Sequence, residues 1–197
     1  MAVASPPHEP TSRDRLIDAG RELFWRRGFH DVGLNQILKT AEVPKGSFYH
    51  HFDSKEAFGQ RVVEDFADES LAVLDAALAG DGPPLEKLRG FFEGQREFYE
   101  ANGCCNGCLV GNVGQELAET SDVLRRTVEL HFARVRARLA GCLGEAARRG
   151  DLADGVDIEL FADVLFSAWH GALLRMKVEK SLKPIDAFLD FHLPRPS

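Results

Sequence analysis

Apolar residues recur at helical spacing along almost the whole chain. Leu16, Leu23 and Phe24 follow the period of an α-helix, and Thr11 with Asp14 before them forms a capping-box pattern. The same reasoning predicts further helices over residues 34–41, 44–52, 53–79, 84–101, 108–119, 122–150 and 157–182, and a short one after Pro184. No segment alternates apolar and polar residues for long enough to predict a strand. The pattern therefore predicts an all-α protein.

The spacing of the predicted helices divides the chain into three parts. Residues 1–10 contain three prolines and no apolar period, so we expect a flexible N-terminal arm. Residues 11–56 hold three short helices with a tight turn at Val43 and Pro44, which is typical of a helix-turn-helix DNA-binding head. Residues 57–197 hold the longer helices, and we expect them to form a helical bundle.

The third predicted helix has two faces of different chemistry. Phe48 and Phe52 are four residues apart, so both are expected to point inward and to anchor the helix. The remaining side chains are small or can form hydrogen bonds, as a helix that enters the major groove of DNA requires. An alternative interpretation is that this segment only closes a helical hairpin.

The detailed sequence of this region favours DNA binding. Residues 33–58, with Gln36-Ile37-Leu38, the run from Val43 to Phe52 and the run from Ser54 to Phe58, closely resemble the DNA-binding signature of the TetR family of transcriptional repressors. This resemblance implies an N-terminal helix-turn-helix head, a C-terminal helical bundle for ligand binding and dimerisation, and a homodimer on a palindromic double-stranded DNA operator. The DNA contacts that it implies are Asn35, Pro44, Lys45, Gly46, Ser47, Tyr49, His50, His51 and Lys55. His51 could instead stabilise the head, and Gly33 stands where many members carry a hydroxyl residue.

The net charge of the whole chain does not exclude nucleic acid as a partner, because the charge is unevenly distributed. The chain of 197 residues has a net charge of −7, which argues against nucleic acid. However, residues 1–56 hold eight Lys or Arg and eight Asp or Glu, so all of the excess acid lies in residues 57–197. The composition is that of a globular protein, without a long apolar run or a leader-like N-terminus. We therefore expect a cytoplasmic protein with no membrane partner.

The C-terminal part offers candidates for a ligand pocket and for a dimer interface. The resemblance implies a regulatory pocket among the helices after the head, and the candidate lining residues are Phe91, Phe92, Gln95, Phe98, Tyr99, Trp169, His170 and Met176. Small residues beside large ones, taken with the resemblance, predict a dimer interface that includes Phe161, Val164, Leu165, Ala168, Trp169, Ala172, Phe188 and Phe191. The alternative for both sets is an ordinary hydrophobic core. The arginine run of residues 122–150 is interrupted by acids, and we interpret it as a solvated face.

The cysteines are unevenly distributed. Cys104, Cys105 and Cys108 lie within five residues, and Cys142 is far along the chain. A zinc site is disfavoured because no fourth ligand follows at a suitable spacing, so we predict no metal and no cofactor. Two interpretations remain open, inert core residues and reactive sensor thiols. A position at the start of a helix, as predicted for Cys108, would lower the pKa of a thiol.

A second motif bears on these thiols. The run from Gly107 to Asn112, followed by Gln115 to Ala118, resembles the NemR- and AcuR-like subgroup of TetR repressors, which respond to electrophiles or small unsaturated acids. This resemblance implies a sensing role for Cys108. The predicted function is a repressor released from its operator by a small-molecule inducer, and not an enzyme. Alternatives are a thiol-redox protein using Cys105 and Cys108, whose expected strand-helix context is missing, and a helical binding module without a DNA role.

Overall fold

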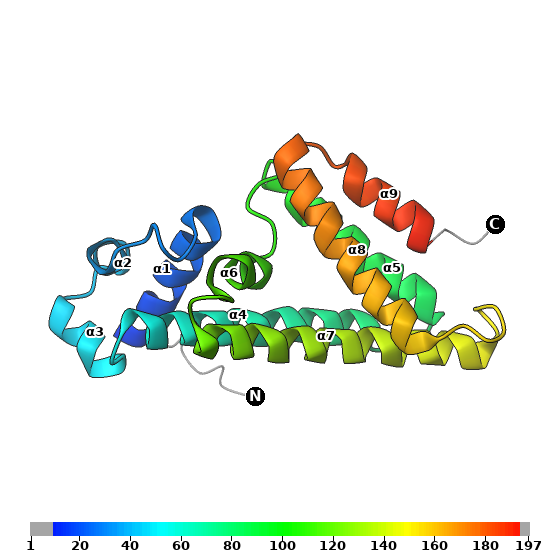
Figure 1. Ribbon diagram of the computed structural model, residues 1–197, viewed down its shortest axis with the longest axis horizontal. Helices are drawn as coiled ribbons and strands as arrows, with labels where there is room; N and C mark the ends of the chain where they lie inside the picture. Colours follow the sequence, from blue (N-terminus) through cyan, green and yellow to red (C-terminus); the bar gives the residue numbers. More distant parts are fainter. Residues whose placement is uncertain (1–9, 194–197) are drawn as a thin grey trace, which may run out of the picture.

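The computed structural model describes residues 10–193, so the predicted arm lies almost entirely outside the described part of the chain. Within that part all regular structure is helical, as predicted (Figure 1). The helices are α1 (Ser12–Arg27), α2 (Leu34–Ala41), α3 (Lys45–His51), α4 (Lys55–Leu78), α5 (Pro84–Ala101), α6 (Leu109–Leu117), α7 (Asp122–Arg149), α8 (Ile158–Glu179) and α9 (Lys183–His192). None of these helices is both long enough and apolar enough to cross a membrane.

The helix ends follow local chemistry, with one correction. Thr11 and Asp14 form the predicted capping box at α1. The helix predicted over residues 53–79 begins at Lys55, and its capping residue is Ser54, whose hydroxyl accepts a hydrogen bond from the Ala57 N–H over 3.0 Å. Asp53 and Ser54 are both residue types that favour the N-cap position, so the sequence does not show which of them caps the helix. The backbone conformation at the start of the helix decides this.

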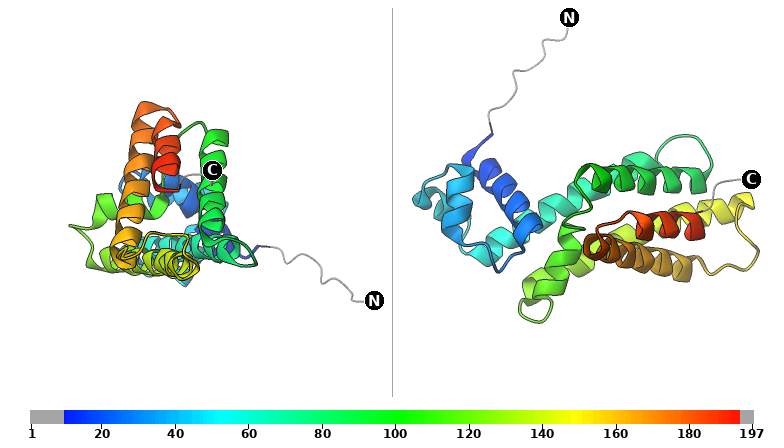
Figure 2. Two further views of the ribbon diagram at one scale, coloured as in Figure 1. Left: turned by 90° about the vertical axis from the view of Figure 1, so that its right-hand side faces the viewer. Right: turned by 90° about the horizontal axis from the view of Figure 1, so that it is seen from above.

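The helices form a head, a long stem and a bundle. Helices α1, α2 and α3 make the head at one end. Helices α4 and α7 run side by side along the molecule and form the stem (Figures 1 and 2). Helices α5, α8 and α9 pack together at the other end and form the bundle, while α6 lies between them and the head. The part of the chain beyond the head is called the body. The boundary expected after residue 56 falls in the first turn of α4. This helix therefore runs from the head into the body without a break.

Aromatic rings form the centre of the head. The ring of Phe58 on α4 lies 5.4 Å from that of Phe48, 5.0 Å from that of Phe52 and 5.8 Å from that of Phe24. A methyl group added to Gly20 would stand only 2.4 Å from Phe58, so this close helix crossing needs a glycine. Phe48 and Phe52 are both buried, which confirms the predicted inner face of the third helix.

A second aromatic cluster fills the bundle. The ring of Phe92 on α5 lies 4.9 Å from both Trp169 on α8 and Phe188 on α9. Cys108 packs against this cluster and also against the core of the head. The thiol at the start of α6 therefore stands where the two cores meet.

Candidate DNA-binding surface and sensor cysteine

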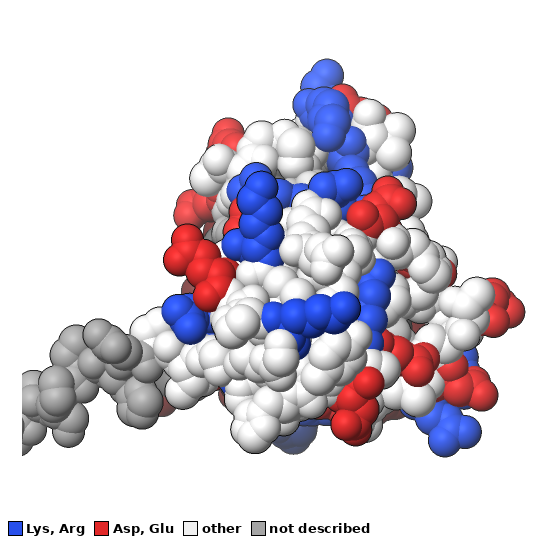
Figure 3. Space-filling model, turned by 90° about the vertical axis from the view of Figure 1, so that its left-hand side faces the viewer, with Lys and Arg blue, Asp and Glu red and all other residues white. Residues whose placement is uncertain are grey.

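Helix α3 presents its polar face at the far end of the head. Lys45, Gly46, Tyr49 and His50 are exposed and Ser47 is half-buried. Tyr49 is 53% exposed, although its ring packs edge-on against the buried Phe48 at 5.4 Å. Figure 3 looks onto this end of the molecule, where most acidic side chains lie towards the edges. A short helix with hydrogen-bonding groups outward and aromatic anchors inward can enter a major groove.

Three further predicted contacts flank this helix. Pro44 is the residue directly before α3 and is exposed, and Asn35 is exposed in the first turn of α2. A methyl group added to Gly46 would meet nothing within 4 Å. The packing of the protein therefore does not require glycine at position 46, which leaves close approach to another molecule as the physical use of a missing side chain.

Two of the predicted DNA contacts are engaged within the protein. The Lys55 ammonium donates to the carbonyl oxygen of Phe29 over 2.6 Å and lies 4.2 Å from the centre of that ring. Burial lowers the pKa of Lys55, although the Glu116 carboxylate opposes this shift. The His51 ring shares a 2.8 Å hydrogen bond with the Ser12 hydroxyl. These contacts support the structural role for His51 and leave Lys55 with fewer free donors for a phosphate.

The cysteine-containing loop between α5 and α6 has an unusual backbone. Cys104 and Asn106 adopt left-handed conformations with φ of 53° and 66°, as do the neighbouring Gly103 and Gly107. For non-glycine residues this conformation costs roughly 1–2 kcal/mol each. All four cysteines are free, and the Cys105 sulfur accepts a 3.7 Å hydrogen bond from the Lys180 ammonium.

Cys108 occupies the N-cap position of α6. Its sulfur accepts a 3.4 Å hydrogen bond from the Gly111 N–H, so the predicted position at the start of a helix is confirmed. The expected lowering of its pKa is wrong. Burial raises the pKa of the Cys108 thiol more than the backbone N–H groups of Gly111 and Val110 lower it. Only a small part of the thiol is therefore in the reactive thiolate form at neutral pH.

The sequence reasoning missed the contacts that join α6 and the cysteine loop to the head. The Trp25 indole N–H donates to the carbonyl oxygen of Gly107 over 2.7 Å. Near the other end of α6, the Glu116 carboxylate accepts hydrogen bonds from the backbone N–H groups of Phe29, over 2.8 Å, and of His30. One short helix thus carries the thiol at its start and is tied to the head at both ends.

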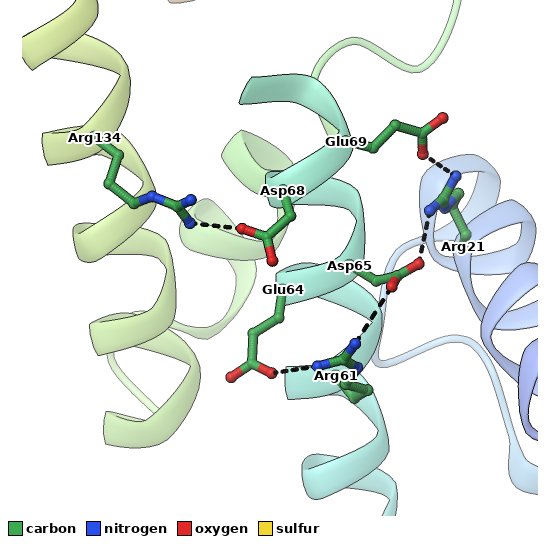
Figure 4. A network of polar contacts seen from close by, with 7 residues as sticks. All are labelled: Arg21, Arg61, Glu64, Asp65, Asp68, Glu69 and Arg134. Carbon is green, nitrogen blue, oxygen red and sulfur yellow. Dashed lines mark hydrogen bonds and ion pairs between the residues drawn. The ribbon is translucent and has the colours of Figure 1, made fainter. Parts of the chain in front are cut away.

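Ion pairs also join α4 to its neighbours (Figure 4). Asp65 on α4 accepts from Arg21 of the head over 2.9 Å, and Asp68 accepts from Arg134 of α7 over 2.7 Å. Further along the stem, Arg138 pairs with Asp75. These arginines of α7 are partly exposed and neutralised by carboxylates. This arrangement is consistent with the predicted solvated face.

None of the predicted pocket residues borders either of two hollows in the structure. Phe92, Tyr99 and Trp169 are buried against one another in the bundle core, and Gln95 is half-buried. A hollow of about 320 Å³ between the head and the body is lined instead by Trp25, Arg26, Arg27, Gly28, Asn112, Gln115, Glu116 and Lys177. A larger one, of about 790 Å³, lies between α5 and α9 and is bordered mostly by charged side chains.

The predicted dimer residues need correction. Leu165, Trp169, Ala172 and Phe188 are buried inside the bundle, because α5, α7 and α9 cover that side of α8. Phe161 and Ala168 are half-buried against the same core. Val164 of α8 and Phe191 of α9, which were also expected at the interface, are exposed, Phe191 by 82%. They belong to an apolar surface, which joins a stripe on the uncovered side of α8 to the end of α9. The exposed stripe consists of Leu160, Val164, Leu174 and Val178.

The cysteine-rich region shows no metal-binding geometry among the described residues. Over residues 10–193, no three side chains of His, Cys, Asp or Glu lie close enough together to hold a metal ion. The same residues contain no strand, so Cys105 and Cys108 are not in the strand-helix setting that thiol-redox motifs use.

Comparison with known proteins decides the family. Residues 16–62 match the family described as bacterial regulatory proteins, tetR family, and residues 84–191 match the tetracyclin repressor-like C-terminal domain. The chain belongs to the TetR family. Its members are transcriptional regulators and not enzymes, which agrees with the geometry of the head.

Relatives at moderate identity cover nearly the whole chain. The chain is 35% identical to the HTH-type transcriptional repressor DhaR of Mycobacterium sp. strain GP1, over 90% of this chain and 88% of that protein. It is 36% identical to the transcriptional regulator AcuR of Cereibacter sphaeroides, over 92% and 84%. The crystal structure of reduced Escherichia coli NemR has a TM-score of 0.85 and 30% identity, with 92% of this chain and 94% of that chain covered. These similarities confirm the predicted fold and the regulator class.

Proposed function

We propose that this TetR-family regulator is a homodimeric, cytoplasmic repressor that an electrophile or a small unsaturated acid releases from a palindromic operator through the region of Cys108. The observation that carries the proposal is the placement of α6. This helix begins at the candidate thiol and holds the head through Glu116, while Gly107 just before it holds Trp25.

The DNA-binding step is assigned to the exposed face of α3. Lys45, Ser47, Tyr49 and His50 supply groups that can contact phosphates or base edges, and Asn35 adds one from α2. One such helix reads few base pairs. Specificity then requires two heads about one DNA turn apart, roughly 34 Å, and hence a dimer.

The dimer interface is assigned to the uncovered stripe of α8 together with the exposed end of α9. Val178, which is 73% exposed, and Phe191 are too apolar to be left in water over a continuous face. A two-fold dimer places the same face of both subunits together, which buries every such residue twice. The two heads are then held at a fixed separation by the stems.

Release follows from a change in the population of two dimer arrangements. A group added to Cys108 must fit where the two hydrophobic cores meet. Helix α6 cannot move to make room without disturbing the hydrogen bonds that connect it to the head, from Trp25 to Gly107 and from Phe29 to Glu116. A displaced head is no longer spaced to match both half-sites. An inducer acts in this way only to the extent that it favours the displaced arrangement over the DNA-bound one.

The test is operator release measured by fluorescence anisotropy with promoter DNA from the protein's own locus. The wild-type protein should bind this DNA and lose at least tenfold in affinity after treatment with N-ethylmaleimide. Cys108→Ser should bind as well as wild type and resist release. Cys142→Ser, which changes a buried thiol in the bundle, is the matched control and should still be released.

Two results would count against the proposal. Absence of operator binding at low salt, with and without reductant, would reject the repressor assignment. Release of Cys108→Ser by maleimide in a background that also lacks the thiols of Cys104 and Cys105 would show that this loop is not the sensor.

A further inference from the structure

His170 on α8 has one ring nitrogen with no hydrogen-bond partner. Its Nδ1 lies 3.0 Å from the carbonyl oxygen of Phe166, which can only accept, so Nδ1 carries the proton. In the neutral ring Nε2 is then a bare acceptor. That atom is buried and unpartnered. A buried polar atom without a partner is uncommon and calls for a physical reason.

The free nitrogen of His170 and the side chain of Cys108 lie against the same point of α6. A methyl group added to Gly111 would stand 3.5 Å from His170 Nε2 and 3.6 Å from the Cβ of Cys108. Gly111 therefore leaves no side chain at this point of α6, between the imidazole and the Cβ of Cys108. The two groups are not hydrogen-bonded to each other, since His170 Nε2 has no partner. The Cys108 sulfur accepts from the Gly111 N–H, which leaves its own S–H free to donate.

We propose that His170 is the general base that removes the proton from the Cys108 thiol when the thiol adds to an α,β-unsaturated carbonyl compound. This inference rests on the sensor role assigned to Cys108 above. It names the residue that makes the thiol reactive. The Phe166 carbonyl holds the His170 ring, and the absence of a side chain at Gly111 leaves Nε2 free on the side of Cys108.

The step balances within the site. The S–H proton passes to His170 Nε2, the sulfur forms a bond to the β-carbon, and the alkene π electrons shift towards the carbonyl. The imidazolium then returns the proton to the α-carbon. No oxidant, reductant or leaving group is required. The reaction matches the general pattern of a nucleophile activated by a neighbouring base whose other nitrogen is oriented by a third group.

The surroundings keep the imidazole neutral and available. Burial lowers the pKa of His170, and burial raises the pKa of the Cys108 thiol. The other titratable groups nearby are Tyr99 of α5, whose pKa burial raises, and His131 of α7, whose pKa falls to about 4. At pH 7 the site therefore holds a protonated thiol, a neutral base and a neutral phenol, and the charged groups near it are Arg134, Asp68 and Arg138, which act on His131.

The first test needs only the pH dependence of the alkylation rate. Residues 97–125 form one tryptic peptide that contains three cysteines, so alkylation measured on this peptide does not distinguish Cys108 from the other two. The measurement is therefore made in the Cys104→Ser/Cys105→Ser background. With His170 as base, the second-order rate of Cys108 with N-ethylmaleimide should be nearly constant between pH 7 and 8. An unassisted thiol below its pKa would instead react about tenfold faster per pH unit. Such a slope in this protein would overturn the proposal.

The second test removes the base and keeps its structural hydrogen bond. His170→Asn retains an N–H donor for the Phe166 carbonyl but lacks Nε2. The rate at pH 7 should fall at least tenfold, and the steep rise with pH should appear, as expected when a general base worth 10²–10⁴ is lost. His131→Asn is the matched control, since His131 is also buried with an unpartnered nitrogen, and its rate and pH profile should be unchanged. An unchanged profile in His170→Asn would reject the assignment.

The outcomes separate this inference from the proposed function. If Cys108 is alkylated and the operator is released equally in wild type and His170→Asn, only the role of His170 fails. If Cys108→Ser is still released in the background without Cys104 and Cys105 thiols, the sensor assignment itself fails.

Discussion

The indole of Trp25 and the backbone of Gly107 are joined by a 2.7 Å hydrogen bond, although 82 residues separate them in the sequence. Trp25 lies in the last turns of α1, and Gly107 directly precedes Cys108. The bond therefore connects the head to the residue next to the candidate sensor. Because Gly107 is buried, its carbonyl oxygen has little access to water that could replace the indole.

Replacing Trp25 with phenylalanine removes this donor and keeps an aromatic ring. We expect the free energy of unfolding to fall by about 1–3 kcal/mol, the usual cost of leaving a buried acceptor unpaired. We also expect the ratio of operator affinities before and after maleimide treatment to shrink at least fivefold, since one of the two ties between head and α6 is gone. Urea unfolding and anisotropy measure the two effects.

Phe98→Leu is the control for that experiment. Its ring lies 5.8 Å from that of Trp25 and carries no hydrogen bond to the loop. The ratio of affinities should be close to the wild-type value in this variant. A wild-type ratio in Trp25→Phe as well would mean that the inducer signal does not pass through Gly107.

The local parts of the fold could be predicted because they depend on short-range periodicity. The four-residue spacing of Phe48 and Phe52 fixes the buried side of α3, and the position of Cys108 at a helix start follows from the pattern after it. The tie between Trp25 and Gly107 could not be predicted. Its acceptor is a backbone carbonyl, which has no signature in the sequence.

The dimer face shows a second limit of sequence reasoning. Helix α8 is apolar on two sides, one with Leu165 and Trp169 and one with Leu174 and Val178. Helical spacing assigns each residue to a side. It does not say which side the rest of the chain will cover, because that depends on where α5, α7 and α9 pack.

The exposed side of α8 predicts the effect of a charge at its centre. In the proposed dimer, Leu174→Glu would place two carboxylates near each other across the two-fold axis, in a desolvated interface. We expect the dimer dissociation constant to rise at least a hundredfold and operator affinity to fall with it. Sedimentation velocity over a concentration series measures the first effect.

A glutamate at another exposed leucine separates interface loss from a general effect of charge. Leu130 on α7 is 62% exposed and lies outside the stripe. Leu130→Glu should remain a dimer at all concentrations where wild type does. Dissociation of both variants, or of neither, would be inconsistent with an interface on α8.

The reading face of α3 predicts two different losses of affinity. Tyr49→Ala should weaken operator binding by about 1–3 kcal/mol, the range for one good base contact, while unfolding stability stays within about 1 kcal/mol because Tyr49 is half-exposed.

Lys45→Ala should weaken binding to operator DNA and to random DNA alike, and it should reduce the slope of affinity against salt concentration by about one unit. Anisotropy titrations at several salt concentrations separate the two. Equal operator affinity in Tyr49→Ala would contradict the placement of α3 in the groove.

The buried His131 predicts how stability responds to acid. Burial is the main reason that its pKa falls from 6.5 to about 4, so the folded protein binds this proton less readily than the unfolded chain does. For a histidine with a lowered pKa, the stabilisation of the neutral form is complete above pH 6.5 and is lost as the pH falls towards 4. The shift corresponds to about 3 kcal/mol over that window.

The variant His131→Asn removes this titration. Between pH 6.5 and 4 its free energy of unfolding should fall less steeply than that of the wild type, by up to about 3 kcal/mol over the window. Urea unfolding at half-unit pH intervals measures the difference, and the exposed His30→Asn, which should follow the wild-type curve, is the control. Parallel curves for wild type and His131→Asn would show that protonation of His131 does not drive the loss of stability in acid.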